Sequence, residues 1–153
     1  MGRPFDPDLV LAMPLMANLA TISDDGPRNA PVWYLWEDGS LWMLGNASGS
    51  SVQRLLRDPR CAVEIVHYDN AGGVLAHLGL RGRATVEAMS PPRFRRLLAK
   101  YLGPDEADWN AWFVRTIARV DDPEGRFIRL APESVFTNNV SYFRTGPDLA
   151  GPE

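Results

Sequence analysis

Two neighbouring apolar segments joined by Asp38-Gly39 constrain the fold more than any other feature of the sequence. Residues 29–37, NAPVWYLWE, carry apolar or aromatic side chains on both of their alternating faces. A strand of this kind has to be covered on both faces. Because Asp-Gly is a strong signal for a two-residue hairpin, we expect the chain to return directly as a second strand over residues 40–44.

The segment after this hairpin predicts a loop of small residues and the start of a helix. Residues 47–51 are all small, so backbone N–H groups there can approach a ligand closely. Ser50 and Gln53 fit a capping box, which places a helix N-terminus at residues 50–51. Such a terminus presents unpaired N–H donors and the positive end of the helix dipole, which favour an anion. The pattern fits either an anion site or an ordinary capped helix.

The rest of the chain predicts strands connected mainly by turns. We expect further strands at residues 16–23, 61–68, 74–89, 126–130 and 134–140, and helices near residues 9–15, 51–57, 90–103 and 106–119. Strands joined by hairpins favour an antiparallel barrel over a doubly wound sheet. The predicted fold class is α+β: an antiparallel barrel of about six or seven strands, with a short helix after the third strand and a late helical pair. We expect one domain over residues 1–153, with an N-terminal arm at 1–7 and a flexible tail at 146–153.

The strand at residues 74–89 should have one polar face. Apolar side chains such as Leu78 and Leu80 alternate there with Arg81 and Arg83. Gly82 predicts a bend or bulge of the kind that small barrels use to turn corners.

Composition narrows the class of protein. The chain is 45% hydrophobic and 23% charged with a net charge of −3, which is typical of a globular domain and excludes disorder as the default. Its basic residues are spread along the chain, so we expect no nucleic-acid partner and no membrane patch. No apolar run reaches the roughly 20 residues of a membrane span, and no signal peptide is recognisable. We expect a cytoplasmic protein.

Amino-acid catalysis has no visible set of residues. The single cysteine, Cys61, excludes an internal disulfide, and its apolar surroundings indicate a buried structural thiol. With only two histidines besides it, we expect no metal site. The usual nucleophile and phosphate-loop motifs are absent, and no catalytic residue can be named. An aromatic-rich chain beside an anion loop suits a protein that leaves its chemistry to a bound cofactor.

Several segments, in this order, resemble a known family. They are RNAPVWY at residues 28–34, LWML at 41–44, the serine-rich loop at 48–51, LLRDPRCAV at 55–63 and LRGRATVE at 80–87. This order is similar to that of the flavin-binding split-barrel family that includes the pyridoxamine 5'-phosphate oxidases. The resemblance covers most of residues 16–140 and implies an antiparallel split β-barrel.

The resemblance also implies a cofactor and a site. Flavin mononucleotide (FMN) would lie at the interface of a homodimer, with its ring beside residues 31–33 and 43–46 and its phosphate at the serine loop. In the family that loop usually carries a basic residue near position 51, where this chain has a serine. Losing a charge-assisted contact of roughly 1.5–3 kcal/mol would weaken binding about tenfold to a hundredfold unless another arginine compensates. The implied cofactor-binding residues, including candidate compensating arginines, are Arg28, Pro31, Val32, Trp33, Met43, Leu44, Gly45, Asn46, Ser48, Ser50, Ser51, Arg54, Arg81 and Arg83.

The expected function is an FMN-dependent oxidoreductase that transfers hydride to or from an unidentified small molecule through flavin N5. Two alternatives stay open: a deazaflavin-dependent reductase on the same fold, and a non-catalytic protein that holds a flavin or, less favoured, a haem. Arg28 is a candidate donor to the ring, but a solvated turn residue explains it equally well. We expect a dimer because Trp33, Trp36, Trp42 and the aromatic late helix together exceed what one small barrel should bury.

Overall fold

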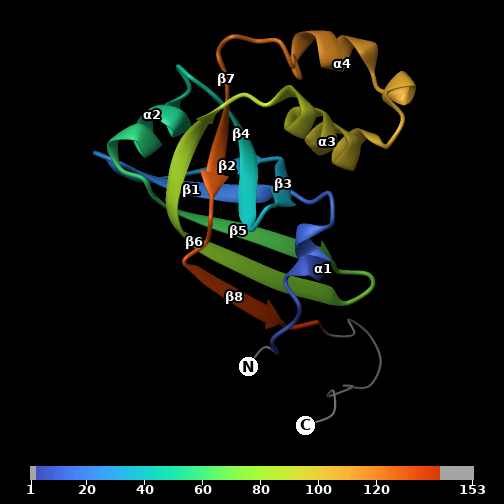
Figure 1. The fold of residues 1–153 in the computed structure, drawn as a ribbon. Coiled ribbons are helices and arrows are strands. Elements are labelled where there is room, and N and C mark those ends of the chain that lie inside the picture. The colour runs from blue at the N-terminus through green and yellow to red at the C-terminus, as the bar shows by residue number, and fades with distance from the viewer. Residues whose placement is uncertain (1–2, 142–153) are drawn as a thin grey trace.

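The computed structural model describes residues 3–141, so the predicted tail at 146–153 lies outside the described residues. The fold class is confirmed as α+β, with eight strands in the described part instead of six or seven (Figure 1). The strands are β1 (Ala17–Ser23), β2 (Gly26–Val32), β3 (Tyr34–Glu37), β4 (Ser40–Asn46), β5 (Arg60–Asp69), β6 (Val74–Ala88), β7 (Gly125–Leu130) and β8 (Ser134–Asn139). The helices are α1 (Asp8–Leu11), α2 (Ser50–Arg57), α3 (Pro91–Leu102) and α4 (Ala111–Thr116), with a 3₁₀ turn η1 (Glu106–Asp108).

All strand pairs are antiparallel, and the path across them is β2-β1-β5-β6-β7-β4-β3, with β8 added to β6. The long strand β6 pairs with β5 up to Arg83 and with β7 from Ala84 onward. Gly82 lies just before this change of partner. A Cβ atom there would meet Leu130 Cδ1 at 3.1 Å and the backbone N of Glu133 at 3.2 Å, so the glycine permits the close approach.

The predicted hairpin forms, but the strand before it is interrupted. Asp38 (φ +54°) and Gly39 (φ +68°) both have positive φ values, as a type I′ turn requires. Residues 29–37 form two strands, because Trp33 leaves the ladder and stacks on Tyr101 of α3 with ring centroids 4.4 Å apart. Helix α2 consequently follows the fourth strand instead of the third.

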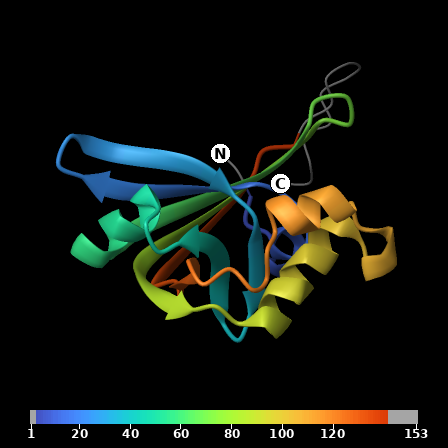
Figure 2. The same ribbon diagram turned by 90° about the horizontal axis from the view of Figure 1, so that it is seen from above.

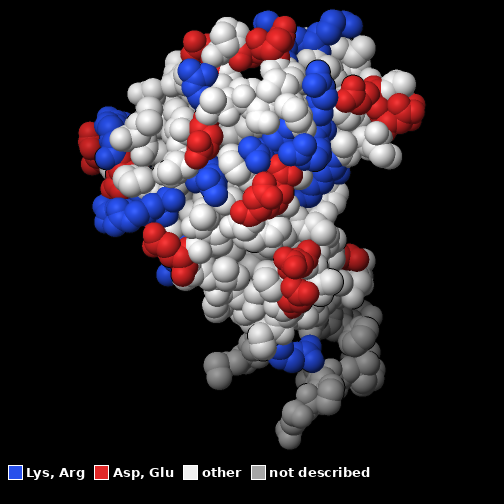
Figure 3. Space-filling view, in the orientation of Figure 1, with Lys and Arg blue, Asp and Glu red and all other residues white. Residues whose placement is uncertain are grey.

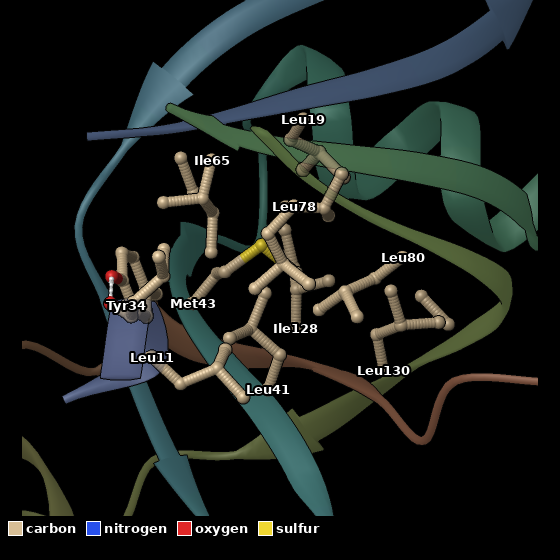
Figure 4. Packing of buried hydrophobic residues seen from close by; sticks show 14 of the residues in the cluster. Leu11, Leu19, Tyr34, Leu41, Met43, Ile65, Leu78, Leu80, Ile128 and Leu130 are labelled. Carbon is tan, nitrogen blue, oxygen red and sulfur yellow. Dashed lines mark hydrogen bonds between the residues drawn. The ribbon is translucent and has the colours of Figure 1, made fainter. Parts of the chain in front are cut away.

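The main core fills the barrel interior (Figure 4). It joins side chains from most strands, among them Leu19, Leu41 and Leu78, which are exposed by 1% or less. Val52 and Leu55 of α2 belong to the same core, so this helix covers one side of it. Figure 2 shows α2 on one side of the molecule and the α3–α4 pair on the other.

A second core packs α3 and α4 against the outside of the barrel. Trp42 is buried in this core, and Trp33 is partly buried against it. Trp36 packs instead against the main core. These three tryptophans therefore find partners within the chain, whereas Trp112 of the late helix α4 is 60% exposed, so the expected dimer stays a prediction. The single helix expected at 106–119 was wrong, because η1 and α4 are separate elements flanking Trp109 and Asn110.

Candidate functional site

The barrel has an open edge where β4 runs beyond its partner. On one side, β4 pairs with β7 as far as Asn46. On the other side, its pairing with β3 ends at Met43. Residues 44–46 therefore have no strand partner along that edge, and β2 is itself an edge strand of the sheet. Unpaired backbone groups of this kind are available to hydrogen-bond a ligand.

Helix α2 begins directly after this open edge. Gly49 is its N-cap residue in an extended conformation, with φ −68° and ψ 145°. Within residues 3–141, the backbone N–H groups of Ser50, Ser51 and Val52 have no acceptor, as the first turn of a helix requires. No acidic residue lies in this first turn. The helix N-terminus thus offers three donors to an anion with no carboxylate on that turn to repel it.

The predicted capping box was wrong. Ser50 is already the first helical residue, and no side chain caps the helix. The Gln53 amide donates instead to the Ala47 carbonyl at 2.7 Å. Ser48 is also engaged locally, since its backbone N–H and its hydroxyl both donate to Asn46 Oδ1, at 3.1 and 2.9 Å. These bonds fix the shape of the loop and leave the donors of the first helical turn free.

Arg54 reaches back from the second turn of α2 toward the neighbouring strand. Its Nε donates to Thr21 Oγ1 at 2.8 Å, and its Nη2 donates to Ser51 Oγ at 3.4 Å. Thr21 lies on β1 and is 2% exposed, so the guanidinium is held by a buried hydroxyl. The structure therefore brings together Ser51, Arg54 and the helix N-terminus. The sequence did not single out Thr21, because nothing local shows which strand α2 covers.

Arg81 and Arg83 do not join this group within one chain. Thr21, Cys61 and Gly82 are paired across three neighbouring strands and so share one face of the sheet. Arg81 and Arg83 flank Gly82 and are both exposed, so they lie on the opposite face. Arg83 lies 4.0 Å from Glu133, and Arg81 lines a hollow on the outer face of the sheet.

The residues expected beside a ring have diverse environments. Pro31 is exposed and Val32 is half-buried, both near the end of β2. The Trp33 ring stacks on Tyr101 and also contacts Phe113, whose ring centroid is 5.7 Å away. The Met43 side chain lies in the main core, so only its backbone can line the open edge.

The remaining predicted residues lie at the edges of this group. Leu44 packs against the second core, whereas Gly45 faces Val52 and Ile128. Asn46 ends β4 and accepts the loop hydrogen bonds described above. Arg28 is exposed, lies 3.7 Å from Asp25 and donates to the Pro27 carbonyl, which is the arrangement of a turn residue.

The described part of the chain gives little support for a reactive thiol, a metal site or a membrane-spanning helix. Burial raises the pKa of the Cys61 thiol to about 11, which fits a structural thiol. Among residues 3–141 no group of His, Cys, Asp and Glu side chains could hold a metal ion. No helix of the described part is long and apolar enough to cross a membrane.

The fold is an antiparallel split barrel in which a helix terminus with free N–H donors lies beside an open strand edge. A family model described as pyridoxamine 5'-phosphate oxidase matches residues 8–139. The chain belongs to this family, and thus to a group of flavin-related, oxidoreductase-type proteins. A search of curated proteins found no significant match.

Solved structures share the fold at low sequence identity. An F420 reductase is 21% identical with a TM-score of 0.67, covering 88% of this chain and 98% of that one. An FAD-binding protein from Mesorhizobium loti is 19% identical with a TM-score of 0.65, covering 91% and 96%. The flavocytochrome Anf3 from Azotobacter vinelandii is 14% identical with a TM-score of 0.64, covering 94% and 68%.

Proposed function

We propose that the chain is a homodimeric, FMN-dependent oxidoreductase that acts on a small molecule. The observation that carries the proposal is the group of free N–H donors at Ser50, Ser51 and Val52 beside the fixed Arg54 guanidinium. These donors lie at the end of the unpaired edge of β4. A phosphate at the helix terminus and a planar ring along the strand edge would use both features.

The donor set fits a phosphate monoester. Three backbone N–H groups and the positive end of the helix dipole would contact its oxygens. Arg54 would add a charge-assisted bond, and the bond to Thr21 already restricts its side chain, so less conformational entropy is lost on binding. We infer that Arg54 replaces the basic residue that the family usually places near position 51.

The open edge of β4 would hold the ring. A bound flavin supplies hydride transfer at N5, so the protein has no need of its own catalytic base. The Ala47 N–H donates toward the β7 side, so the N–H groups of Leu44 and Asn46 point to the open edge and could donate to the ring where negative charge develops. Val32, half-buried at the end of β2, would contribute apolar contact.

A deazaflavin is the second candidate cofactor. Two observations favour keeping it: Ser51 brings no charge to the phosphate loop, and a solved structure with this fold is an F420 reductase. A non-catalytic flavin or haem protein is the third reading, because the flavocytochrome Anf3 also has this fold.

The dimer is supported by an exposed face of the sheet. The outer face of β1, β5, β6 and β8 carries a hollow of about 340 Å³. Phe136 at its rim is 56% exposed, and Tyr68 on β5 is 59% exposed. A second copy on this face would cover these side chains and bring a partner's Arg81 toward a shared cofactor site.

The deciding experiment combines a visible spectrum with cofactor titration. A flavin absorption band in the purified protein, or saturable quenching of added FMN, is expected. FMN should bind at least about tenfold more tightly than riboflavin, which has the same ring and lacks the phosphate. Equal affinities would exclude the phosphate site. Binding of F420 without binding of FMN would show that the protein uses a deazaflavin. A Soret band in the purified protein would show that it holds a haem.

A further inference from the structure

A groove separates α3 from the α4 segment and has an apolar floor. It consists of two adjoining hollows of about 680 and 400 Å³. Both hollows are lined by Val114 and Val120, and the second is also lined by Leu98 and Trp109. Leu98 is fully buried at the base. The Trp109 indole donates to the Gly103 carbonyl at 2.8 Å, so this wall is fixed.

Three arginines surround this floor. Arg95 and Arg115 line both hollows, and Arg119 lines the larger one. Arg95 lies 3.9 Å from Glu106 and Arg119 lies 3.7 Å from Asp121, and all four side chains are exposed. Exposed pairs at these distances hold their arginines weakly. In the described part of the chain no acidic side chain lies within ion-pair distance of Arg115.

The charges at the rim favour a negatively charged ligand. Three guanidinium groups face two carboxylates, which leaves an excess of one positive charge over an apolar floor. Figure 3 shows basic groups, with acidic groups among them, gathered over the α3–α4 end of the molecule. Guanidinium groups pair well with carboxylates, and the floor would bury an apolar tail.

We propose that this groove binds a small monocarboxylate with an apolar tail, with the carboxylate at Arg115 and the tail over Val114 and Val120. Figures 1 and 2 place the α3–α4 pair on the opposite side of the barrel from α2. The groove is therefore a second binding site, separate from the phosphate donors at the α2 terminus.

The test uses octanoate as the probe and Trp109 as a nearby reporter. Octanoate should change the tryptophan fluorescence saturably, whereas octylamine, which has the same tail and the opposite charge, should not. Arg115→Gln should weaken octanoate binding about two- to fivefold, the range expected for an exposed charge pair. Val114→Ser should weaken it independently by removing part of the apolar floor.

The matched control is Arg57→Gln, which removes an exposed arginine from α2 on the far side of the barrel. It should leave octanoate binding unchanged. No saturable octanoate signal at millimolar concentration, or equal affinities for the Arg115→Gln and Arg57→Gln variants, would overturn the site. Tighter binding of octyl phosphate than of octanoate would overturn the monocarboxylate assignment. None of these readouts requires a bound flavin, so failure here leaves the proposed oxidoreductase untouched, and the reverse also holds.

Discussion

Arg54 Nε donates a hydrogen bond of 2.8 Å to Thr21 Oγ1, and this bond joins the second turn of α2 to strand β1. Thr21 is one of two buried polar side chains recorded for the described chain, the other being Ser40. Because the hydroxyl accepts from Nε, the guanidinium is held close to Ser51 at the start of the helix. The position of the only basic side chain that meets the helix terminus in the described part thus depends on a contact between residues 33 positions apart.

Removing this guanidinium should weaken FMN binding selectively. We expect Arg54→Gln to raise the Kd for FMN about tenfold or more, because the variant loses one charge-assisted hydrogen bond to the phosphate. Riboflavin, which has no phosphate, should bind with nearly unchanged affinity. Flavin fluorescence quenching measures both. Arg57→Gln is the control, since Arg57 lies in the last turn of the same helix and should have little effect. An equal loss of riboflavin affinity would point to a folding defect instead.

Restoring the basic residue that the family usually places in the loop should strengthen the phosphate site. Ser51→Lys puts a cation beside the free N–H donors and is expected to tighten FMN binding by up to about tenfold. The gain should fall as salt is raised. Leu56→Lys adds the same charge at an exposed position in the second half of α2 and serves as the control. No gain from Ser51→Lys would mean that position 51 does not face the phosphate.

Gly45 allows α2 to pack on β4. A Cβ atom at this position would lie 2.7 Å from Val52 Cγ2 and 3.3 Å from Ile128 Cδ1. Val52 is short and branched, so Gly45→Ala should displace the helix and lower the free energy of unfolding by about 1–3 kcal/mol. Urea denaturation tests this. Gly79→Ala is the control, because its nearest contact would be an ordinary 3.7 Å to Phe136 Cβ.

A charge on the exposed sheet face should disrupt the dimer. Phe136→Glu is expected to raise the dimer dissociation constant at least about tenfold and to lower FMN affinity in parallel if the site is shared. Light scattering and FMN titration measure the two effects. Ile117→Glu, at an equally exposed position just after α4, should change neither. A wild-type protein that is monomeric at micromolar concentration would contradict the shared-site proposal.

Much of the fold could be predicted because local patterns determine it. The turn at Asp38-Gly39 needs two residues with positive φ, and the sequence supplies residues suited to it. A helix near residues 90–103 forms as expected, and Ser90 caps it, since its hydroxyl accepts from the Arg93 N–H. In β6, Leu78 and Leu80 are buried while Arg81 and Arg83 are exposed, as their alternation predicts.

The parts that could not be predicted depend on distant partners. Trp33 interrupts its strand to stack on Tyr101, which is far along the chain. The alternation in β6 correctly placed Arg81 and Arg83 on one face, but only the pairing of β6 with β5 and β1 shows that this face lies away from Arg54. A local motif also gave a wrong prediction. Ser50 and Gln53 have the spacing of a capping box, but the helix starts one residue earlier, with Gly49 as its N-cap.

Lys100 should make stability depend on pH in the alkaline range. Its Nζ donates to the carbonyls of Leu11 (2.8 Å) and Tyr34 (3.2 Å) and lies 3.6 Å from the Tyr34 ring centroid. These contacts favour the ammonium form, but burial outweighs them and lowers the pKa of Lys100 from 10.5 to about 8. The unfolded chain therefore binds more protons than the folded chain between these two pKa values, so the free energy of unfolding should rise with pH there.

Comparison with a variant isolates this effect. Relative to Lys100→Met, which does not titrate, the wild type should gain about 1 kcal/mol between pH 8 and pH 10, after allowance for screening of a partly exposed group. Lys100→Arg, which stays charged over this range, should match the flat profile of Lys100→Met. Measurements should stop at pH 10, because burial raises the pKa values of Tyr34 and Tyr101, and their unfolded-state ionisation near 10.0 would then lower stability. Parallel curves for the wild type and Lys100→Met by urea denaturation would show that the amine titrates normally, with no net cost of burial.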